Sequence, residues 1–195
     1  MSTSRCRRAG IAGVCCMAAL LLASCGAPPL TVYTLGPPAT DVGAAPLGRT
    51  PVVIAVARVS IPDELDTEDI VVRDGSTLRR SRLGRWASRL SLGITDRLTR
   101  RLAERRPDAL VTDRPLTESP AERVMVNIGR LDVTAAGIAT LDADWLVVRR
   151  GGSAPASHDR GHFSATGPVA NDQDVVTLVG QLLDQLAGAI DIGRR

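Results

Sequence analysis

The sequence has little of what most enzymes use. Its 195 residues include no lysine, two histidines, two tryptophans, one tyrosine and one phenylalanine. Without lysine there is no phosphate-binding loop that ends in Gly-Lys, and no Gly-x-Ser-x-Gly or His-Glu-x-x-His motif is present. All four cysteines lie in the first 25 residues, which excludes disulfides and thiol nucleophiles from the rest of the chain. A content of 44% hydrophobic and 23% charged residues indicates one globular domain.

Few side chains remain as candidates for a metal site or an active site. His158 and His162 lie near Asp159 in a segment that the sequence predicts to be a loop, where they could bind a metal. A zinc site usually needs three or four fixed ligands, so a solvated loop is favoured. The acidic run over residues 63–69 lacks the ligand spacing of a calcium loop and indicates a solvated turn. We therefore predict no metal site and no catalytic residue.

The first 24 residues have the composition of a secretory signal. Arg5, Arg7 and Arg8 precede an apolar run over residues 9–23, which is shorter than the roughly 20 residues that a membrane-spanning helix needs. This segment holds three of the 24 basic residues and none of the 21 acidic ones, so the remaining chain has a formal net charge of zero. The basic character that could indicate nucleic-acid binding belongs to the signal, and we expect no nucleic-acid partner.

The signal ends in Leu22-Ala23-Ser24-Cys25, which resembles the bacterial lipobox. In a lipobox the cysteine thiol receives diacylglycerol through a thioether, and the small residues before it let the segment enter the signal peptidase. Cys25 would then carry an N-acyl chain as well, such as palmitate, and at about 0.8 kcal/mol per buried methylene several chains give a lasting membrane anchor. Gly26 resembles the residue that sorts lipoproteins to the outer membrane. An ordinary signal peptide with an incidental cysteine is the alternative.

Beyond the signal we predict two regions. Residues 25–50, rich in Pro, Gly and Ala, form the lipidated N-terminus and a flexible tether, in which residues 32–35 could dock as an edge strand. Residues 51–195 form the folded domain. Its first segment, 51–59, is apolar at both odd and even positions, which predicts a strand in the centre of a sheet.

The rest of the domain alternates between two apolar periods. Apolar residues every three or four positions from Leu83 and Trp86 onward predict a helix from about 85 to 105. We expect extended segments at 70–73, 109–112, 122–133, 138–149 and 162–166, a bulge at Gly129, a loop over 150–160, and a last helix capped by Asn171 or Asp172. This order predicts an α/β fold, a single-domain sandwich of a mixed β-sheet with two main helices packed on it. Trp86 and Trp145 are expected in its core.

Several arginines lie largely off the apolar stripe of the first helix or just before it. The candidates for contacts with an acidic partner or with lipid headgroups are Arg85, Arg97, Arg100 and Arg101. The simpler alternative is a solvated helix face on which these arginines pair with Asp96 and Glu104.

A series of short motifs follows the lipobox. They are Tyr33-x-Leu35, Val59-Ser60-Ile61-Pro62 with Leu65-Asp66, Ile70-Val71-x-Arg73, Leu78-x-x-Ser81, Arg85-Trp86-Ala87 with Leu90, Val126 through Asp132, and Leu141-x-Ala143-x-Trp145. In this order and spacing they resemble the ABC-type transport auxiliary lipoprotein family, to which the PqiC (YmbA) lipoproteins belong. The likeness spans nearly the whole chain after the signal.

The resemblance implies an α/β domain that is anchored in the outer membrane and faces the periplasm. It implies an MCE-domain protein and an ABC-type permease as partners, in a system that moves lipids or other hydrophobic molecules between membranes. It implies no catalytic residue, and no cofactor besides the diacylglycerol and N-acyl lipid on Cys25. Self-association as a ring is expected by analogy alone. We therefore expect a non-enzymatic docking lipoprotein, and the alternative is a carrier that binds an acyl chain in an apolar pocket.

Overall fold

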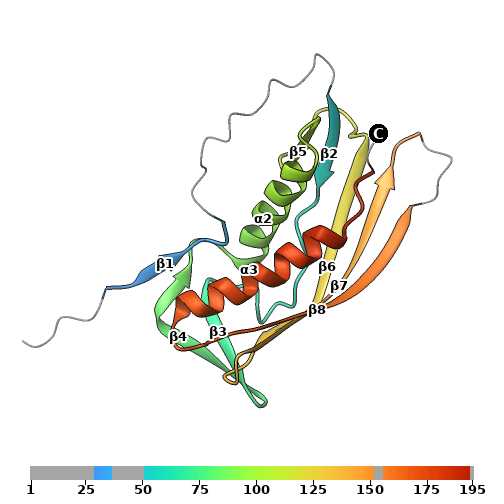
Figure 1. Cartoon of the computed structure of the whole chain (residues 1–195). Coiled ribbons are helices and arrows are strands. Elements are labelled where there is room, and N and C mark those ends of the chain that lie inside the picture. Colours follow the sequence, from blue (N-terminus) through green and yellow to red (C-terminus); the bar gives the residue numbers. More distant parts are fainter. Residues whose placement is uncertain (1–28, 37–50, 152–155, 194–195) are drawn as a thin grey trace, which may run out of the picture. The chain divides into compact units, whose positions relative to one another are not determined.

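A computed structural model describes residues 29–36, 51–151 and 156–193. The predicted signal, the lipobox with Cys25 and most of the predicted tether lie outside these residues. From residue 31 onward the chain forms one unit. In this unit two helices, α2 (Leu90–Arg105) and α3 (Asp172–Ala189), lie on one face of a five-stranded sheet, and a three-stranded sheet adjoins it (Figure 1).

Both sheets are mixed. The larger has the order β5 (Ala109–Thr112), β2 (Val52–Val56), β6 (Glu122–Val133), β7 (Ile138–Arg149) and β8 (Ser157–Thr166). In it β2 is parallel to both neighbours, and β6, β7 and β8 form an antiparallel meander. The smaller has the order β1 (Thr31–Tyr33), β4 (Thr77–Trp86) and β3 (Asp69–Asp74), with β1 parallel and β3 antiparallel to β4.

The predicted fold class is confirmed: the domain is α/β with mixed strands and two main helices, although the strands form two sheets instead of one. The strands predicted at 109–112, 122–133 and 138–149 have the ends observed for β5, β6 and β7. The bulge expected at Gly129 is confirmed by the register shift between Ile128 and Arg130. The internal position predicted for the strand at 51–59 is also confirmed, but β2 ends at Val56.

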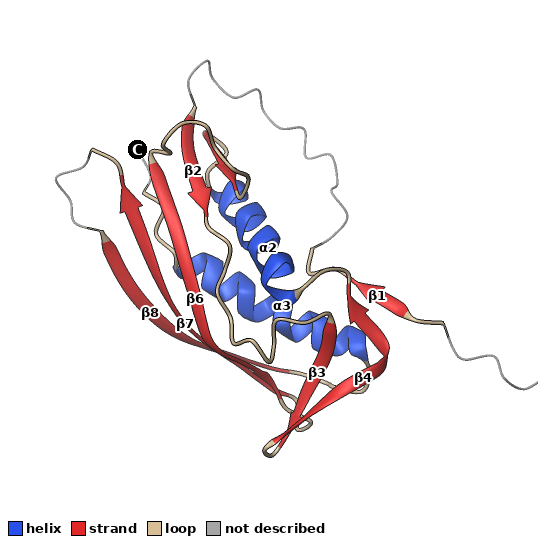
Figure 2. Cartoon of the chain, turned by 180° about the vertical axis from the view of Figure 1, so that it is seen from behind, coloured by secondary structure: helices blue, strands red, loops and turns tan. Residues whose placement is uncertain are grey.

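The core lies between the helices and the inner face of the larger sheet. Helix α2 buries Ile94, Leu98 and Leu102 there, at intervals of four residues, so that one stripe of the helix faces the sheet. The last helix adds Leu182, Leu183 and Leu186, and both tryptophans are buried, as predicted. Figure 2, seen from the opposite side, shows the outer face of β6, β7 and β8 with no helix over it.

Two local features fix the ends of these elements. The side chain of Asn171 accepts a hydrogen bond from the backbone N–H of Asp174 (3.1 Å), and the Asp174 carboxylate accepts one from the Asn171 N–H (3.2 Å). This capping box starts α3 at one of the two predicted caps. Gly137 turns the chain between β6 and β7 with φ of +80°, and a Cβ there would lie 2.2 Å from the carbonyl oxygen of Gly167, so no other residue fits.

The predicted start of the first helix is wrong. Leu83 and Trp86 belong to strand β4, and α2 begins at Leu90. The backbone N–H of Trp86 donates to the carbonyl oxygen of Glu68 (2.7 Å), and that of Ala87 donates to the carbonyl oxygen of Tyr33 (2.8 Å). Hydrogen bonds to distant segments therefore hold this part of the chain extended, although its apolar spacing continues that of the helix.

The predicted loop over 150–160 is also too long. Strand β8 begins at Ser157, so His158 lies in the same strand as His162 and not in a loop. The side chains of His158, Arg160 and His162 share one face because alternate residues of a strand point the same way. That face is exposed. An exposed edge strand tolerates such polar side chains, which is why its composition resembles that of a loop.

We predict that Leu98→Ala lowers the free energy of unfolding by about 2–5 kcal/mol. Leu98 is fully buried on the inner face of α2, and the substitution leaves a cavity there. Urea denaturation of the purified protein, followed by the fluorescence of the two buried tryptophans, measures this loss. The matched control is Leu92→Ala on the same helix. Leu92 is exposed, so a loss within about 0.5 kcal/mol is expected. Equal losses for the two variants would contradict the core described here.

Candidate functional site

Most of the sequence motifs listed above meet at the junction of the two sheets with the start of α2. The backbone N–H of Leu90 donates to the carbonyl oxygen of Thr67 (3.1 Å). On the side of the larger sheet, the N–H of Ser60 donates to the carbonyl oxygen of Val126 (3.1 Å), and the N–H of Ile128 donates to that of Ser60 (2.8 Å). The segment between β2 and β3 is therefore held between the larger sheet and the helix.

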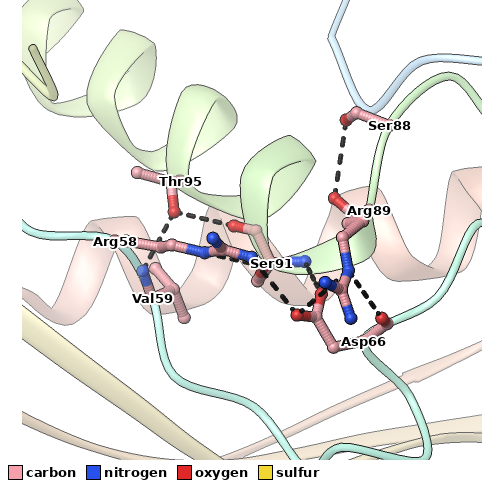
Figure 3. A network of polar contacts seen from close by, with 7 residues as sticks. All are labelled: Arg58, Val59, Asp66, Ser88, Arg89, Ser91 and Thr95. Carbon is pink, nitrogen blue, oxygen red and sulfur yellow. Dashed lines mark hydrogen bonds and ion pairs between the residues drawn. The ribbon is translucent and has the colours of Figure 1, made fainter.

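Asp66 is the centre of the polar contacts at this junction (Figure 3). Its carboxylate accepts a hydrogen bond from the backbone N–H of Ser91 (3.0 Å) in the first turn of α2. It also forms ion pairs with Arg58 (3.3 Å) and Arg89 (3.6 Å). Burial opposes the charged carboxylate, but the hydrogen bonds from Ser91 and the two guanidinium groups outweigh it and lower the pKa of Asp66.

Two hydroxyl groups extend this network along α2. The Ser91 hydroxyl accepts hydrogen bonds from the Arg58 guanidinium at 2.8 and 3.1 Å. One turn further, the Thr95 hydroxyl donates to the Ser91 carbonyl (2.7 Å) and accepts from the backbone N–H of Val59 (3.0 Å). The network in Figure 3 thus satisfies backbone and side-chain groups internally and fixes the connection between β2 and β3.

A second carboxylate, which is buried, joins the two sheets. Asp132 on β6 accepts hydrogen bonds from Arg73 on β3 (2.5 Å) and from Arg130 on its own strand (2.8 Å). Burial of Asp132 raises its pKa. The hydrogen bonds from Arg130 and Arg73 lower the pKa by more than burial raises it, so the net shift is downward. A backbone bridge between Arg73 and Thr134 lies beside this pair.

A third carboxylate, that of Asp184, connects the two helices. Arg97 and Arg101 on α2 each donate two hydrogen bonds to Asp184 on α3, at distances from 2.8 to 3.0 Å. Arg97 also donates to the carbonyl oxygen of Leu35, just after β1. A groove of about 530 Å³ lies beside this cluster and is lined by Tyr33, Leu35, Arg97, Thr177, Gln181 and Asp184, among others.

The structure separates the four predicted arginine contacts. Arg97 and Arg101 meet at Asp184, Arg100 pairs with Asp96, and Arg85 lies on β4, where it pairs with Asp69 (3.1 Å). Arg101 also pairs with Glu104 (2.9 Å), so the simpler alternative of pairing with Asp96 and Glu104 does occur. Contacts of these arginines with a partner or with headgroups stay a prediction. The sequence analysis missed Asp184, because no local pattern tells that it faces α2.

The two histidines lie on the exposed face of β8. Nδ1 of His162 lies 2.5 Å from a carboxylate oxygen of Asp142 on β7, and the Asn127 side chain donates to Asp144 (2.9 Å) beside them. Within residues 29–36, 51–151 and 156–193 no group of three or more His, Cys, Asp or Glu side chains is placed to hold a metal ion.

The fold and these sites define a class of protein: an α/β domain in which paired arginines and carboxylates hold distant segments together. A family model described as the ABC-type transport auxiliary lipoprotein component matches residues 33–191. The chain therefore belongs to this family, as the motifs predict. The family is one of transport lipoproteins and is not an enzyme class. No curated protein matches the chain.

Solved structures support the fold. A crystal structure of an uncharacterized protein is similar with a TM-score of 0.66 and 18% identity, covering 83% of this chain and 95% of that one. A protein of the DUF330 family from Xanthomonas campestris is similar with a TM-score of 0.59 and 13% identity, covering 82% of this chain and 90% of that one. At these identities the likeness concerns the fold alone. Among the described residues, neither helix has the length and hydropathy needed to cross a membrane.

We predict that Asp184→Asn destabilises the protein at neutral pH by about 1–2 kcal/mol, because it removes the charge that holds Arg97 and Arg101. The loss stays small because the Asp184 side chain is 35% exposed and solvent screens the pairs. Asp96→Asn, which alters an exposed pair on the same helix, is the control and should cost at most about 0.5 kcal/mol.

We also predict that the stability difference between wild type and Asp184→Asn depends on pH. Burial raises the pKa of Asp184, but the hydrogen bonds from Arg101 and Arg97 outweigh this, so its folded pKa lies below the ordinary value of 3.8. A carboxyl group with a lowered folded pKa stabilises the protein above its unfolded pKa, and this contribution is lost as the pH falls through the folded value. Urea titrations from about pH 6 to about pH 2.5 should therefore show the gap between wild type and Asp184→Asn closing below about pH 4. A gap that widened there would contradict the assignment.

Proposed function

We propose that this protein is a non-enzymatic lipoprotein of the outer membrane that faces the periplasm and docks a transport system which spans the envelope. Membership of the auxiliary lipoprotein family supports this role. The lipobox Leu22-Ala23-Ser24-Cys25 supports the anchor, with diacylglycerol and an N-acyl chain on Cys25. The partners in this proposal are an MCE-domain protein and an ABC-type permease, and the cargo is a lipid or another hydrophobic molecule.

The observation that carries the non-enzymatic role is the use of three carboxylates that are buried or partly buried. Asp66, Asp132 and Asp184 each contact two arginines, and each joins segments that are distant in the sequence. A catalytic carboxylate needs access to a substrate and a pKa near the working pH. These three carboxylates instead have lowered pKa values and are occupied by internal partners. Such a domain is suited to present a stable surface to a partner protein.

The surface of α2 is the candidate contact with the partner. Arg97, Arg100 and Arg101 lie on two successive turns of this helix, and Asp184 holds two of them in place. A guanidinium group that is already oriented loses less entropy when it binds a carboxylate. We include self-association as a ring in this proposal by analogy with oligomeric tunnels.

We predict that Cys25→Ser abolishes acylation and releases the protein from the membrane fraction, because the lipobox then has no thiol at position 25 to form the thioether. Fractionation of the cell envelope, with mass spectrometry of the mature N-terminus, measures both effects. Ser24→Ala, which keeps the thiol and a small residue before it, is the control and should remain acylated and membrane-bound. A Cys25→Ser protein that stayed in the outer membrane with transport intact would contradict the proposal.

We further predict that Arg100→Glu weakens co-purification with the MCE-domain partner about tenfold, because reversal of a contact charge costs about 1–2 kcal/mol of binding free energy. The pair that is lost within the helix, with Asp96, contributes little to folding. Arg123→Glu on β6 is the matched control, since Arg123 is exposed and lies outside α2. If both variants bound the partner as wild type does, the contact would not involve α2.

A further inference from the structure

The three-stranded sheet has two exposed aliphatic side chains. Val32 on β1 is 57% exposed and Leu83 on β4 is 45% exposed. Val32 is paired in register with Arg85, and Leu83 precedes Arg85 by two residues on the same strand. Because alternate residues of a strand share a face, Val32 and Leu83 lie on the outer face, opposite the buried Trp86. Arg82 precedes Leu83 in the stretch of β4 between Arg80 and Arg85 where the register with β3 shifts, so strict alternation does not turn it inward, and it is exposed as well. We call Val32, Leu83 and Arg82 the β1–β4 patch.

Arg82 differs from the other arginines of β4. Arg79 pairs with Asp74, and both Arg80 and Arg85 pair with Asp69. Among the described residues Arg82 has neither an ion-pair partner nor a side-chain hydrogen bond, and it is exposed. An unpaired guanidinium group beside exposed aliphatic side chains is the composition of surfaces that contact a bilayer: the aliphatic groups enter the interface and the cation pairs with lipid phosphate.

The length of the chain places this patch near the lipid anchor. Only six residue steps separate Cys25 from Thr31, where β1 begins its pairing with β4. A fully extended chain spans at most about 3.5 Å per residue, so the Cα atom of Thr31 lies within about 21 Å of the Cα atom of Cys25. The opposite end of the domain is less constrained, because the 16 residues of α2 separate β4 from β5 by about 24 Å.

We propose that the β1–β4 patch rests on the bilayer that holds the acyl chains of Cys25, with Val32 and Leu83 at the headgroup level and Arg82 on lipid phosphate. This orientation rests on the lipid anchor of the proposed function. It directs β5 and the end of α2 away from the membrane, towards a partner in the periplasm.

The test uses the acylated protein in vesicles of phosphatidylethanolamine and phosphatidylglycerol. Because acylation occupies Cys25 and signal cleavage removes the other cysteines, an introduced cysteine is the single free thiol. A fluorophore is attached in turn to Val32→Cys, Leu83→Cys and Leu110→Cys. Leu110 is a matched control on β5, aliphatic and 38% exposed. Quenching by nitroxide-labelled lipid should be at least about threefold stronger at positions 32 and 83 than at 110, because only the former lie at the interface.

Charge reversal gives a second readout. Arg82→Glu, in the protein labelled at position 32, should reduce the quenching about twofold, since it removes the attraction to lipid phosphate and adds repulsion. Arg123→Glu is its control, because Arg123 is another exposed arginine without a partner among the described residues. The tryptophan fluorescence of each variant verifies the fold.

The outcomes separate this proposal from the proposed function. Mass spectrometry that found no acyl chain on Cys25 would overturn the anchor and the orientation together. An acylated protein that binds its partner but shows quenching at position 110 equal to or above that at 32 and 83 would overturn the orientation alone. Acylated protein with no quenching at any position would also overturn it.

Discussion

The helices α2 and α3 cover only one face of the five-stranded sheet. The side chains on the inner face of β6 and β7 are therefore buried only where these helices pack against them. Each buried leucine, isoleucine or valine contributes about 1.5–3 kcal/mol through this burial. The Asp66 network holds the first turn of α2, and Asp184 joins α3 to α2. The capping box at Asn171 sets where α3 begins. The apolar contact supplies the stability, and the polar contacts select one arrangement of it.

The polar contacts depend on the geometry of the arginine side chain. Arg97 and Arg101 each donate through Nε and one Nη to the two oxygens of Asp184, a forked geometry that an ammonium group cannot form. A half-buried carboxylate is stable only where donors replace its lost water. At Asp66 and Asp132 arginines on different segments again do this. The charges of the domain are thus largely structural.

The regular elements could be predicted because their signals are local. The alternation over 138–149 and the apolar stripe of α3 need no knowledge of distant residues, and both predictions are confirmed. The errors occurred where a distant partner decides the conformation: the spacing of Trp86 continues that of α2, but backbone bonds to Glu68 and Tyr33 hold it in a strand. The partners of Asp66, Asp132 and Asp184 could not be predicted, because each contact joins segments whose proximity exists only in the fold.

The pairing of β1 with β4 shortens the link between the predicted lipid anchor and the domain. The sequence predicts about 25 residues between Cys25 and the domain, enough for a flexible spacer. Because residues 31–33 pair with β4 and Leu35 is buried, the domain effectively begins at residue 31, and residues 37–50 connect β1 to β2 instead of leading to the anchor. With the lipid anchor proposed for Cys25, the start of β1 stays close to the membrane, so a partner has to approach the domain where the anchor holds it. A domain held in this way stays in one place at the membrane. Its orientation there determines which of its surfaces a partner can bind.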